Sequence, residues 1–327
     1  CLYKQLQEDL YYSRRAAFTS GTLANFRTQW KSFIVFCLYF DLTCLPATTN
    51  TVCLYIQYLS RYFTSVTSIK NYLNGIRVLH LYAGLEFTVL QSFECKMLLR
   101  GISRLKQHRV RRAAPITPQI LLDLYHLMDL NEPLILASWV AYVLVFFLMS
   151  RKANLVPSSI RSFDPCKHLT RGNLVVVDNG LLVTITWSKT NQFGERILQV
   201  PLPRIRGSPL CPVRAYEQLV KLVPAESYCA AFTYACKPKL HTVTQYMFVK
   251  ILRLHLEKAG YNASSFSGHS FRRGGATFAF AAGVPGELIQ IHGDWASDAY
   301  LKYLDVSLHS RWQVGLKMRD LILTYQN

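Results

Sequence analysis

The feature that most constrains this chain of 327 residues is an uncharged, apolar run from Pro133 to Ser150, PLILASWVAYVLVFFLMS. The run approaches the length of a membrane-spanning helix. It contains a proline and serines, however, and no second run of this kind follows. A helix that is apolar on all sides is also typical of the centre of a large domain. We therefore expect a buried core helix here and no membrane partner.

Positive charge is in large excess, with 37 Lys and Arg against 19 Asp and Glu and a net charge of +18. Hydrophobic residues make up 50% of the chain, which excludes disorder over most of it. The basic residues must then lie outside the cores, in both halves of the chain. A surface of this kind attracts polyanions, so a nucleic acid is the expected partner. A basic surface that serves only solubility is the alternative.

The nine cysteines are scattered, with no C-x-x-C pair and no histidines at metal-ligand spacing. This pattern argues against a disulfide framework and a structural zinc ion. It is typical of a reducing compartment, the cytosol or the nucleus. No cofactor is expected from these residues.

The length suggests two domains. A basic stretch from Arg104 to Ile116, RLKQHRVRRAAPI, is expected to be an extended linker between them. Its Arg109, Arg111 and Arg112 are candidate contacts to a nucleic-acid backbone, and the cluster is also a plausible nuclear-import signal. The expected organisation is a helical domain over residues 1–103, the linker over 104–116, and a second domain over 117–327.

The first domain is expected to be helical throughout, for example over residues 20–40 and 65–83, where a Ser precedes apolar residues at helical spacing. Arg27 and Lys31 are four residues apart in the first of these helices. Lys70 and Arg77 lie two turns apart in the second. These four are candidate phosphate contacts, although a solvated helix face explains each pair as well.

The second domain is expected to open with a helix capped by Thr117 and started by Pro118. Three strands follow, over residues 173–177, 181–187 and 196–202, with a turn at 191–194. Further helices are expected over residues 214–222, 245–259, 269–282, 285–292, 298–305 and 309–325. The predicted class is α+β, mostly helical, with a small antiparallel sheet.

The most informative segment runs from residue 268 to 305, GHSFRRGGATFAFAAGVPGELIQIHGDWASDAYLKYLD. His269 and Arg272 form an H-x-x-R pair, which on a helix places an imidazole and a guanidinium on one face, where both can meet one phosphate. A helix stop, a new helix start, and then aromatic residues follow in order. They are Gly283, Pro285, the run Leu288-Ile289-Gln290, Gly293-Asp294-Trp295, Tyr300 and Tyr303.

In this order the residues resemble the signature of the tyrosine recombinase (phage integrase) superfamily: H-x-x-R, an Ile-Gln helix leading to a His or Trp, then a nucleophilic Tyr. GDWASDAYLKYL looks most like the recombinases of crypton, DIRS and Ngaro mobile elements. The resemblance covers residues 113–327. It implies a helical core-binding (SAM-like) domain before the catalytic domain, with two more site residues upstream, Arg151 after the apolar run and Lys189 in the hairpin.

The resemblance implies phosphoryl transfer without metal or ATP. Arg151 and Arg272 would hold the phosphate oxygens, which gain charge during attack. A tyrosine hydroxyl ionises only near a pH of about 10, so attack needs a base. His269 would be the general base or proton acceptor and Tyr303 the nucleophile, leaving a covalent phosphotyrosine. Lys189 would supply the proton to the departing 5′ oxygen.

Trp295 occupies the family's His or Trp position, where its ring packs the site and its indole N–H can donate to the phosphate or support the nucleophile. His292 precedes that position and is expected to act at most through its neighbours. Tyr300 lies one helical turn before Tyr303 and is the alternative nucleophile. We favour Tyr303 because it ends the motif, as the family's tyrosine does.

Together these features predict a DNA strand-exchange enzyme that clamps double-stranded DNA between two domains and integrates or excises a mobile element in the nucleus. Relatives assemble as tetramers on two DNA sites and pass the last helix between protomers. Residues 309–325 would do the same or fold back on their own chain. The alternatives are a domesticated DNA-binding protein without activity, a metal-dependent transposase or nuclease, and a relaxing topoisomerase.

Overall fold

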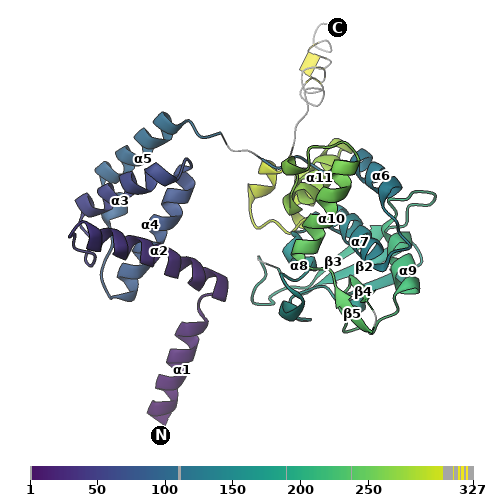
Figure 1. The fold of residues 1–327 in the computed structure, drawn as a ribbon, viewed down its shortest axis with the longest axis horizontal. Coiled ribbons are helices and arrows are strands. Elements are labelled where there is room, and N and C mark those ends of the chain that lie inside the picture. Colours follow the sequence, from purple (N-terminus) through teal and green to yellow (C-terminus); the bar gives the residue numbers. More distant parts are fainter. Residues whose placement is uncertain are drawn as a thin grey trace. The chain divides into compact units, whose positions relative to one another are not determined.

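The computed structural model describes residues 2–109, 112–188, 190–236 and 238–304, together with Trp312, Leu316, Met318, Arg319 and Ile322. Internal contacts divide the chain into two units, Cys1–Arg111 and Arg112–Asn327 (Figure 1). Each unit has its own hydrophobic core. The predicted helix over residues 309–325 lies outside the described residues except at the five single positions.

The first unit is helical, as the sequence predicts. Thr19 and Thr48 begin two of its helices, because each hydroxyl accepts a hydrogen bond from the backbone N–H three residues later. The core is built from aromatic and β-branched side chains of the second, third and fourth helices, with Phe33, Tyr55 and Ile69 fully buried. The helices are α1 (Leu2–Ala16), α2 (Ser20–Tyr39), α3 (Thr49–Tyr62), α4 (Val66–Tyr82) and α5 (Phe93–Lys106), with a short 3₁₀ helix η1 (Val89–Gln91) before α5.

The end of the first unit differs from the sequence prediction in one respect. Helix α5 continues through Arg104 to Lys106 and ends at Gln107, which adopts a left-handed conformation with φ of 43°. The first residues of the predicted linker therefore belong to the helix. Leu105 is 86% exposed, so this last turn has no apolar partner to mark it as helical in the sequence.

The apolar run forms α7 (Pro133–Phe147), in which every residue from Leu136 to Phe146 is buried. The predicted core helix is confirmed. It packs against α9 (Pro212–Leu222), α10 (Gln245–Lys258) and α11 (Gly268–Ala281), and α6 (Pro118–Leu127) packs on α10. Within the described ranges, no helix has both the length and the apolar character needed to cross a membrane.

The predicted small antiparallel sheet is present. Its strands are β1 (Leu174–Val177), β2 (Gly180–Ile185) and β3 (Leu198–Pro203), in the order β1-β2-β3. Val183 of the central strand pairs with Leu174 on one side and with Val200 on the other. All three side chains are buried in the core of the second unit. The loop that joins the end of β2 to the start of β3 contains the predicted turn at residues 191–194.

Two expectations for the rest of the second unit are wrong. We expected only helices after residue 212, but β4 (Thr233–Cys236) and β5 (Lys239–Thr242) form a second antiparallel pair. Strands of four residues are too short to show a period in the sequence. We also expected an α-helix over residues 298–305, and the structure has a 3₁₀ helix there, η5 (Asp298–Lys302). Tight 3₁₀ turns of this length are common as connectors.

Two adjacent glycines let α11 approach its neighbours closely. A Cβ atom on Gly274 would lie 1.7 Å from the Ile116 carbonyl oxygen, and one on Gly275 would lie 2.2 Å from the Phe146 carbonyl oxygen. Any side chain at these two positions would push α11 away from α7 and from the segment around Ile116, near the start of the second unit. The close packing places the start of α11 beside the C-terminal end of α7, followed by α8 (Lys152–Leu155). α12 (Gly286–His292) follows α11.

Candidate active site

Arg272 is the central side chain of the site. It lies on α11 and is 1% exposed. Its Nη1 donates hydrogen bonds to the carbonyl oxygens of Met149 and Gly293, the second at 2.8 Å. Burial, and after it the charge of Arg151, lower the pKa of the guanidinium, while Tyr303 and Asp294 act in the opposite direction. An arginine still carries its charge at neutral pH, so the chain holds a buried cation here.

Trp295 lies against this cation. The guanidinium carbon of Arg272 is 3.6 Å from the centre of an indole ring that is itself buried, a cation–π contact. Gly293 makes room for the indole, because a Cβ atom there would be 1.7 Å from Cζ3 of Trp295. The backbone N–H of Trp295 donates to the Gln290 carbonyl at 3.0 Å, which anchors the tryptophan to α12. The ring thus fixes one face of the guanidinium.

Three buried N–H donors in this cluster have no acceptor among the described residues. They are Nε and Nη2 of Arg272 and Nε1 of Trp295. Leaving a buried donor unsatisfied costs about 1–3 kcal/mol, and more for a charged group. A phosphate oxygen would satisfy such donors and would also compensate the charge.

Arg151 comes four residues after the end of α7 and is the N-cap of α8, and it is partly buried. The chain turns sharply just before it, at Met149, where φ is 47°. The charge of Arg151 lowers the pKa of both Arg272 and His269, which places it in the same cluster. An anion between two such arginines would favour the charged form of both.

His269 lies one helical turn before Arg272 on α11, and its imidazole is exposed at the mouth of the cluster. Partial desolvation lowers the pKa of His269, and the positive charges of Arg151, Arg272 and Lys152 lower it further. The imidazole is therefore neutral at neutral pH and can accept a proton. Its ring centre is 6.5 Å from that of Tyr303, and no hydrogen bond between the two side chains is observed.

The structure separates the two candidate tyrosines. Tyr303 is partly buried, with the Arg272 guanidinium 5.5 Å from its ring centre and the Trp295 ring 5.6 Å away. Tyr300 points elsewhere: its hydroxyl lies at the start of α12, 2.6 Å from where a Cβ atom of Gly286 would be. Tyr303 is thus the tyrosine that faces both Arg272 and His269, as the sequence interpretation expects.

His292 has a structural role. Its Nε2 lies 2.8 Å from the Phe147 carbonyl oxygen, a hydrogen bond that joins α12 to the end of α7. It contacts neither Arg272 nor Tyr303 in the interactions observed. Trp295, which the sequence interpretation assigns to the family's His or Trp position, lies beside the guanidinium.

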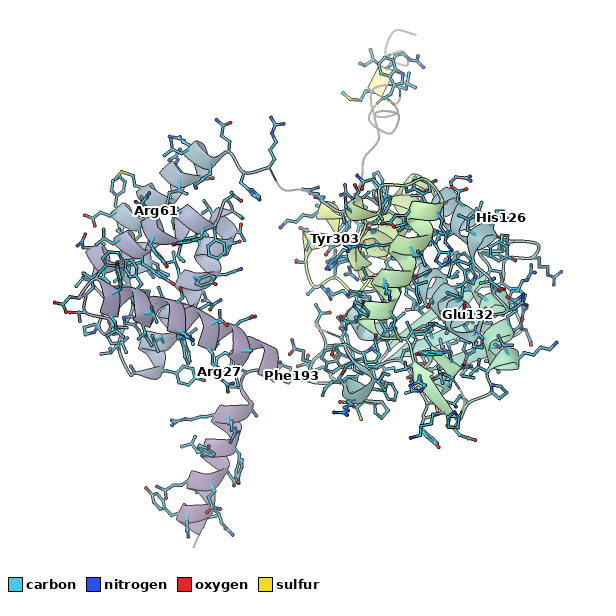
Figure 2. All side chains as sticks on the ribbon, viewed as in Figure 1. Arg27, Arg61, His126, Glu132, Phe193 and Tyr303 are labelled. Atoms are coloured by element: carbon cyan, nitrogen blue, oxygen red, sulfur yellow. The ribbon has the colours of Figure 1, made fainter. Side chains whose placement is uncertain are left out.

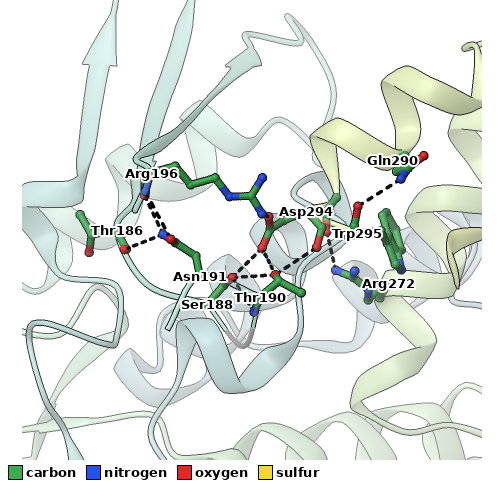
Figure 3. A network of polar contacts seen from close by, with 10 residues as sticks. Thr186, Ser188, Thr190, Asn191, Arg196, Arg272, Gln290, Asp294 and Trp295 are labelled. Atoms are coloured by element: carbon green, nitrogen blue, oxygen red, sulfur yellow. Dashed lines mark hydrogen bonds and ion pairs between the residues drawn. The ribbon is translucent and has the colours of Figure 1, made fainter. Parts of the chain in front are cut away.

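Lys189 lies outside the described residues, but both of its neighbours are placed. Ser188 and Thr190 each donate a hydrogen bond to Oδ2 of Asp294, at 2.6 and 2.5 Å (Figure 3). Arg196, at the far side of the same loop, forms an ion pair with Oδ1 of Asp294. The loop between β2 and β3 is therefore attached to the segment that carries Trp295.

Sequence reasoning missed the role of Asp294 and of Asn191. The Asn191 side chain donates to the carbonyl oxygens of Thr186 and Arg196, at 3.1 and 2.6 Å, and so closes the base of the loop (Figure 3). The available signal was modest: a loop with several Ser, Thr and Asn residues, and two acidic residues, Asp294 and Asp298, inside the motif GDWASDAYLKYL. Neither indicates which residues are partners.

The candidate phosphate contacts of the first unit lie on its surface. Arg27 and Lys31 are exposed on α2, and Lys70 and Arg77 are exposed on α4 (Arg27 is labelled in Figure 2). Arg77 donates to the Asn74 side chain at 3.1 Å. A groove of about 530 Å³ between α4 and α5 brings Lys70 together with two basic residues that the sequence interpretation did not name, Lys96 and Arg100.

The candidate contacts of the linker are placed in part. Arg109 is exposed. Arg112 is also exposed, and its Nη1 donates to the Lys302 carbonyl oxygen at 3.3 Å, one residue before Tyr303. Arg111 lies outside the described residues. Among the described residues, no group of three or more His, Cys, Asp and Glu side chains is placed to hold a metal ion.

Comparison with known proteins agrees with this geometry. No protein-family model matches the chain. It is 23% identical over 263 residues to an integrase/recombinase xerD homolog from Selenomonas ruminantium, covering 79% of this chain and 73% of that protein.

The chain is similar in structure to lambda integrase (75–356) in a dimer bound to a COC′ core site. That match has a TM-score of 0.58 and 15% identity, and covers 91% of this chain and 93% of that one. The chain has the tyrosine recombinase fold.

A second solved structure supports the same fold. XerH recombinase in a post-cleavage complex with a palindromic difH substrate matches with a TM-score of 0.53 and 11% identity, over 87% of this chain and 75% of that chain. The predicted fold class and the resemblance to the tyrosine recombinase superfamily are confirmed. The particular resemblance to crypton, DIRS and Ngaro recombinases stays a prediction.

Proposed function

We propose that this chain is a site-specific tyrosine recombinase that cleaves and rejoins double-stranded DNA. The observation that carries the proposal is the cluster around Arg272. A buried guanidinium with two unsatisfied donor nitrogens lies beside a second arginine, a neutral imidazole and the ring of Tyr303. Such a site suits a phosphodiester, whose charge the two arginines balance.

The proposed reaction needs only groups of this chain and its substrate. The Tyr303 hydroxyl oxygen attacks the phosphorus and forms a P–O bond, while the bond from phosphorus to the 5′ oxygen breaks. His269 accepts the tyrosine proton, directly or through a phosphate oxygen, and Lys189 gives a proton to the 5′ oxygen. The product is a 3′-phosphotyrosyl bond and a free 5′ hydroxyl. Attack by another 5′ hydroxyl reverses these steps and joins a new strand.

Binding of duplex DNA is supported by charge on both units. In the first unit the exposed cations Arg27, Lys31, Lys70 and Arg77 lie on α2 and α4, and Lys96 and Arg100 add to this charge. Basic residues of this kind contact phosphates and fix the position of the protein on DNA. Arg109 at the end of the first unit and Arg112 at the start of the second are exposed and add to this charge.

The wider role is proposed from the sequence motif. GDWASDAYLKYL resembles the recombinases of mobile elements, so we propose integration or excision of such an element in the nucleus. The basic cluster Arg109–Arg112 supports import into the nucleus. Exchange of strands between two sites requires a cleaving protomer for each strand, which supports a tetramer on paired DNA sites.

The test is covalent capture. The protein is incubated in EDTA with a pool of duplexes that carry a randomised core and a nick that lets the cleaved 5′ end diffuse away. Denaturing gels then report protein bound to DNA. We expect an adduct with the wild type and with Tyr300→Phe, and none with Tyr303→Phe. Loss only in Tyr300→Phe would reassign the nucleophile, and tight DNA binding without any adduct would favour a DNA-binding protein that no longer cleaves.

A further inference from the structure

Asp294 joins two parts of the second unit that are far apart in the sequence. Its carboxylate accepts hydrogen bonds from Ser188 and Thr190 and pairs with Arg196, all on the loop between β2 and β3. These partners lie about a hundred residues earlier in the chain. One side chain thus holds both sides of the loop at once, before and after its tip (Figure 3).

The backbone at Asp294 is in a conformation that costs free energy for a residue with a side chain. Its φ is 54°, in the left-handed region that glycine adopts without cost and other residues adopt at a cost. If only the turn mattered, glycine would be the more stable residue at this position. Asp41 adopts the same conformation without a side-chain hydrogen bond among the described residues, so the backbone alone does not assign a role; at Asp294 the contacts of the carboxylate offset the cost of the conformation.

The position of Asp294 in the chain couples the loop to the phosphate-binding cluster. The preceding residue, Gly293, gives its carbonyl oxygen to Nη1 of Arg272 at 2.8 Å. The following residue, Trp295, lies against the same guanidinium. Any displacement of the loop is thus transmitted through Asp294 to both contacts that orient Arg272.

The carboxylate has the charge that this role requires. The Asp294 side chain is 12% exposed, against 56% for Arg196. Burial raises the pKa of Asp294, but the hydrogen bonds from Ser188 and Thr190, with the charge of Arg196, outweigh it and lower the pKa overall. The group is ionised at neutral pH and accepts charge-assisted hydrogen bonds, which are the stronger kind.

We propose that Asp294 is a positioning residue that fastens the β2–β3 loop beside Arg272 and so prepares the departure of the 5′ oxygen. The mechanical part rests on the contacts described above. The chemical part rests on the proposed function, in which Lys189 of this loop protonates the 5′ oxygen. Asp294 acts through the loop and does not itself touch the substrate.

The first experiment tests the attachment without any DNA. Hydrogen–deuterium exchange is measured by mass spectrometry on wild type, Asp294→Gly and Asp41→Gly. Asp41 is a matched control, an exposed aspartate in the first unit with φ of 52° and no side-chain hydrogen bond among those observed. We expect amides of residues 188–196 to exchange about tenfold faster in Asp294→Gly only, because charge-assisted hydrogen bonds are lost. Unchanged exchange of these amides would overturn the proposal.

The second experiment tests the chemical part. Covalent adduct formation is timed with an ordinary DNA substrate and with one whose 5′ bridging oxygen is replaced by sulfur, a leaving group that departs without a proton. We expect Asp294→Gly to be at least about tenfold slower than wild type on the ordinary substrate, a part of the roughly 100- to 10,000-fold that one general acid contributes. We expect much of that loss to disappear with sulfur, and no loss in Asp41→Gly. An equal loss on both substrates would overturn the role in leaving-group departure.

Faster loop exchange with no adduct from wild type on either substrate would instead contradict the proposed function and leave the attachment in place.

Discussion

Arg171 and Arg272 are two buried arginines of the second unit with nearly the same local contacts. They are 5% and 1% exposed, and each gives one nitrogen to two backbone carbonyl oxygens. Each also lies over an aromatic ring, Tyr216 in one case and Trp295 in the other, and each has two buried nitrogens without an observed acceptor. By these measures alone the two sites are equivalent.

They differ in the charges around them. The groups that influence the pKa of Arg171, apart from burial, are Tyr216 and Cys229, and both favour its charged form. Arg272 has Arg151 close by, and the same cations act on His269. A buried arginine with free donors is thus not sufficient evidence of a site. Repulsion between cations that the fold holds together is the feature that distinguishes a place for an anion from a structural contact.

The largest expected effect comes from removing each arginine. We expect Arg272→Met to slow adduct formation by at least about 100-fold, because it removes a donor to the charge that develops on the phosphate. Its free energy of unfolding should fall less than that of Arg171→Met, because relief of the repulsion with Arg151 offsets the loss of the donor to the Met149 and Gly293 carbonyls. Arg171→Met should lower the free energy of unfolding by about 1–3 kcal/mol, because the carbonyls of Val223 and Thr233 lose their donor.

Urea unfolding and adduct rates per folded molecule test this pair of variants. If Arg171→Met remained stable but lost cleavage, and Arg272→Met kept cleavage, the roles assigned to the two arginines would have to be exchanged.

A smaller effect is expected from the glycine beside each arginine. A Cβ atom at Gly293 would be 1.7 Å from the Trp295 ring, so Gly293→Ala must move the indole away from Arg272. We expect a loss of about 1–3 kcal/mol in stability from the forced repacking, and at least a severalfold loss of cleavage. At Gly172 the nearest atom is the Ser227 carbonyl oxygen at 3.2 Å, which a small shift accommodates. Gly172→Ala should therefore be close to wild type in thermal unfolding and in adduct rate; equal cleavage losses in both variants would remove this distinction.

The smallest effect concerns the pKa of His269. Because the charge of Arg151 lowers that pKa, Arg151→Gln should raise it. The pKa of His168 is lowered mainly by burial and raised by Asp164, so it should not change. Titration of the two imidazoles by NMR measures both. A pKa of His269 that is the same in Arg151→Gln and wild type would show that the two groups do not interact.

The sign of the stability effect follows from the same shift. His269 has a lower pKa in the folded chain than in the unfolded one, where it is about 6.5. Its contribution to stability is therefore complete above the unfolded pKa and is lost as pH falls through the folded pKa. Between pH 8 and 5, urea unfolding of wild type should lose more stability than that of Arg151→Gln, whose folded pKa is closer to the unfolded value.

The sequence is informative where one local rule decides the structure. An uncharged apolar run has only a core or a membrane to enter, and α7 is buried as expected. The H-x-x-R spacing places His269 and Arg272 on one helix face, and the structure keeps them together. The spacing does not show that His269 is exposed and Arg272 is buried. The burial of Arg272 depends on its contacts with Trp295 and with the residues after α7.

Contacts between distant segments are where sequence reasoning stops. In the sequence, Asp294 looks like an ordinary turn residue. Its partners Ser188 and Thr190 lie more than a hundred residues away. Nothing in their spacing connects them. The hairpin β4–β5 was missed for a related reason, since its stability comes from pairing and from contact with α7 rather than from a local pattern.

The way in which Arg272 is anchored has a further consequence for how an anion would enter. Its observed hydrogen bonds go to neutral carbonyl oxygens of Met149 and Gly293, and the nearby carboxylate of Asp294 is occupied by the loop. An incoming phosphate therefore breaks no direct ion pair of Arg272 among those observed, and the carboxylate of Asp294 acts on the guanidinium only through its charge. Recognition at this position is expected to begin with a guanidinium whose Nη1 is already oriented by two carbonyl oxygens and whose Nε and Nη2 have no observed acceptor, so that binding and alignment of the phosphate occur in one step.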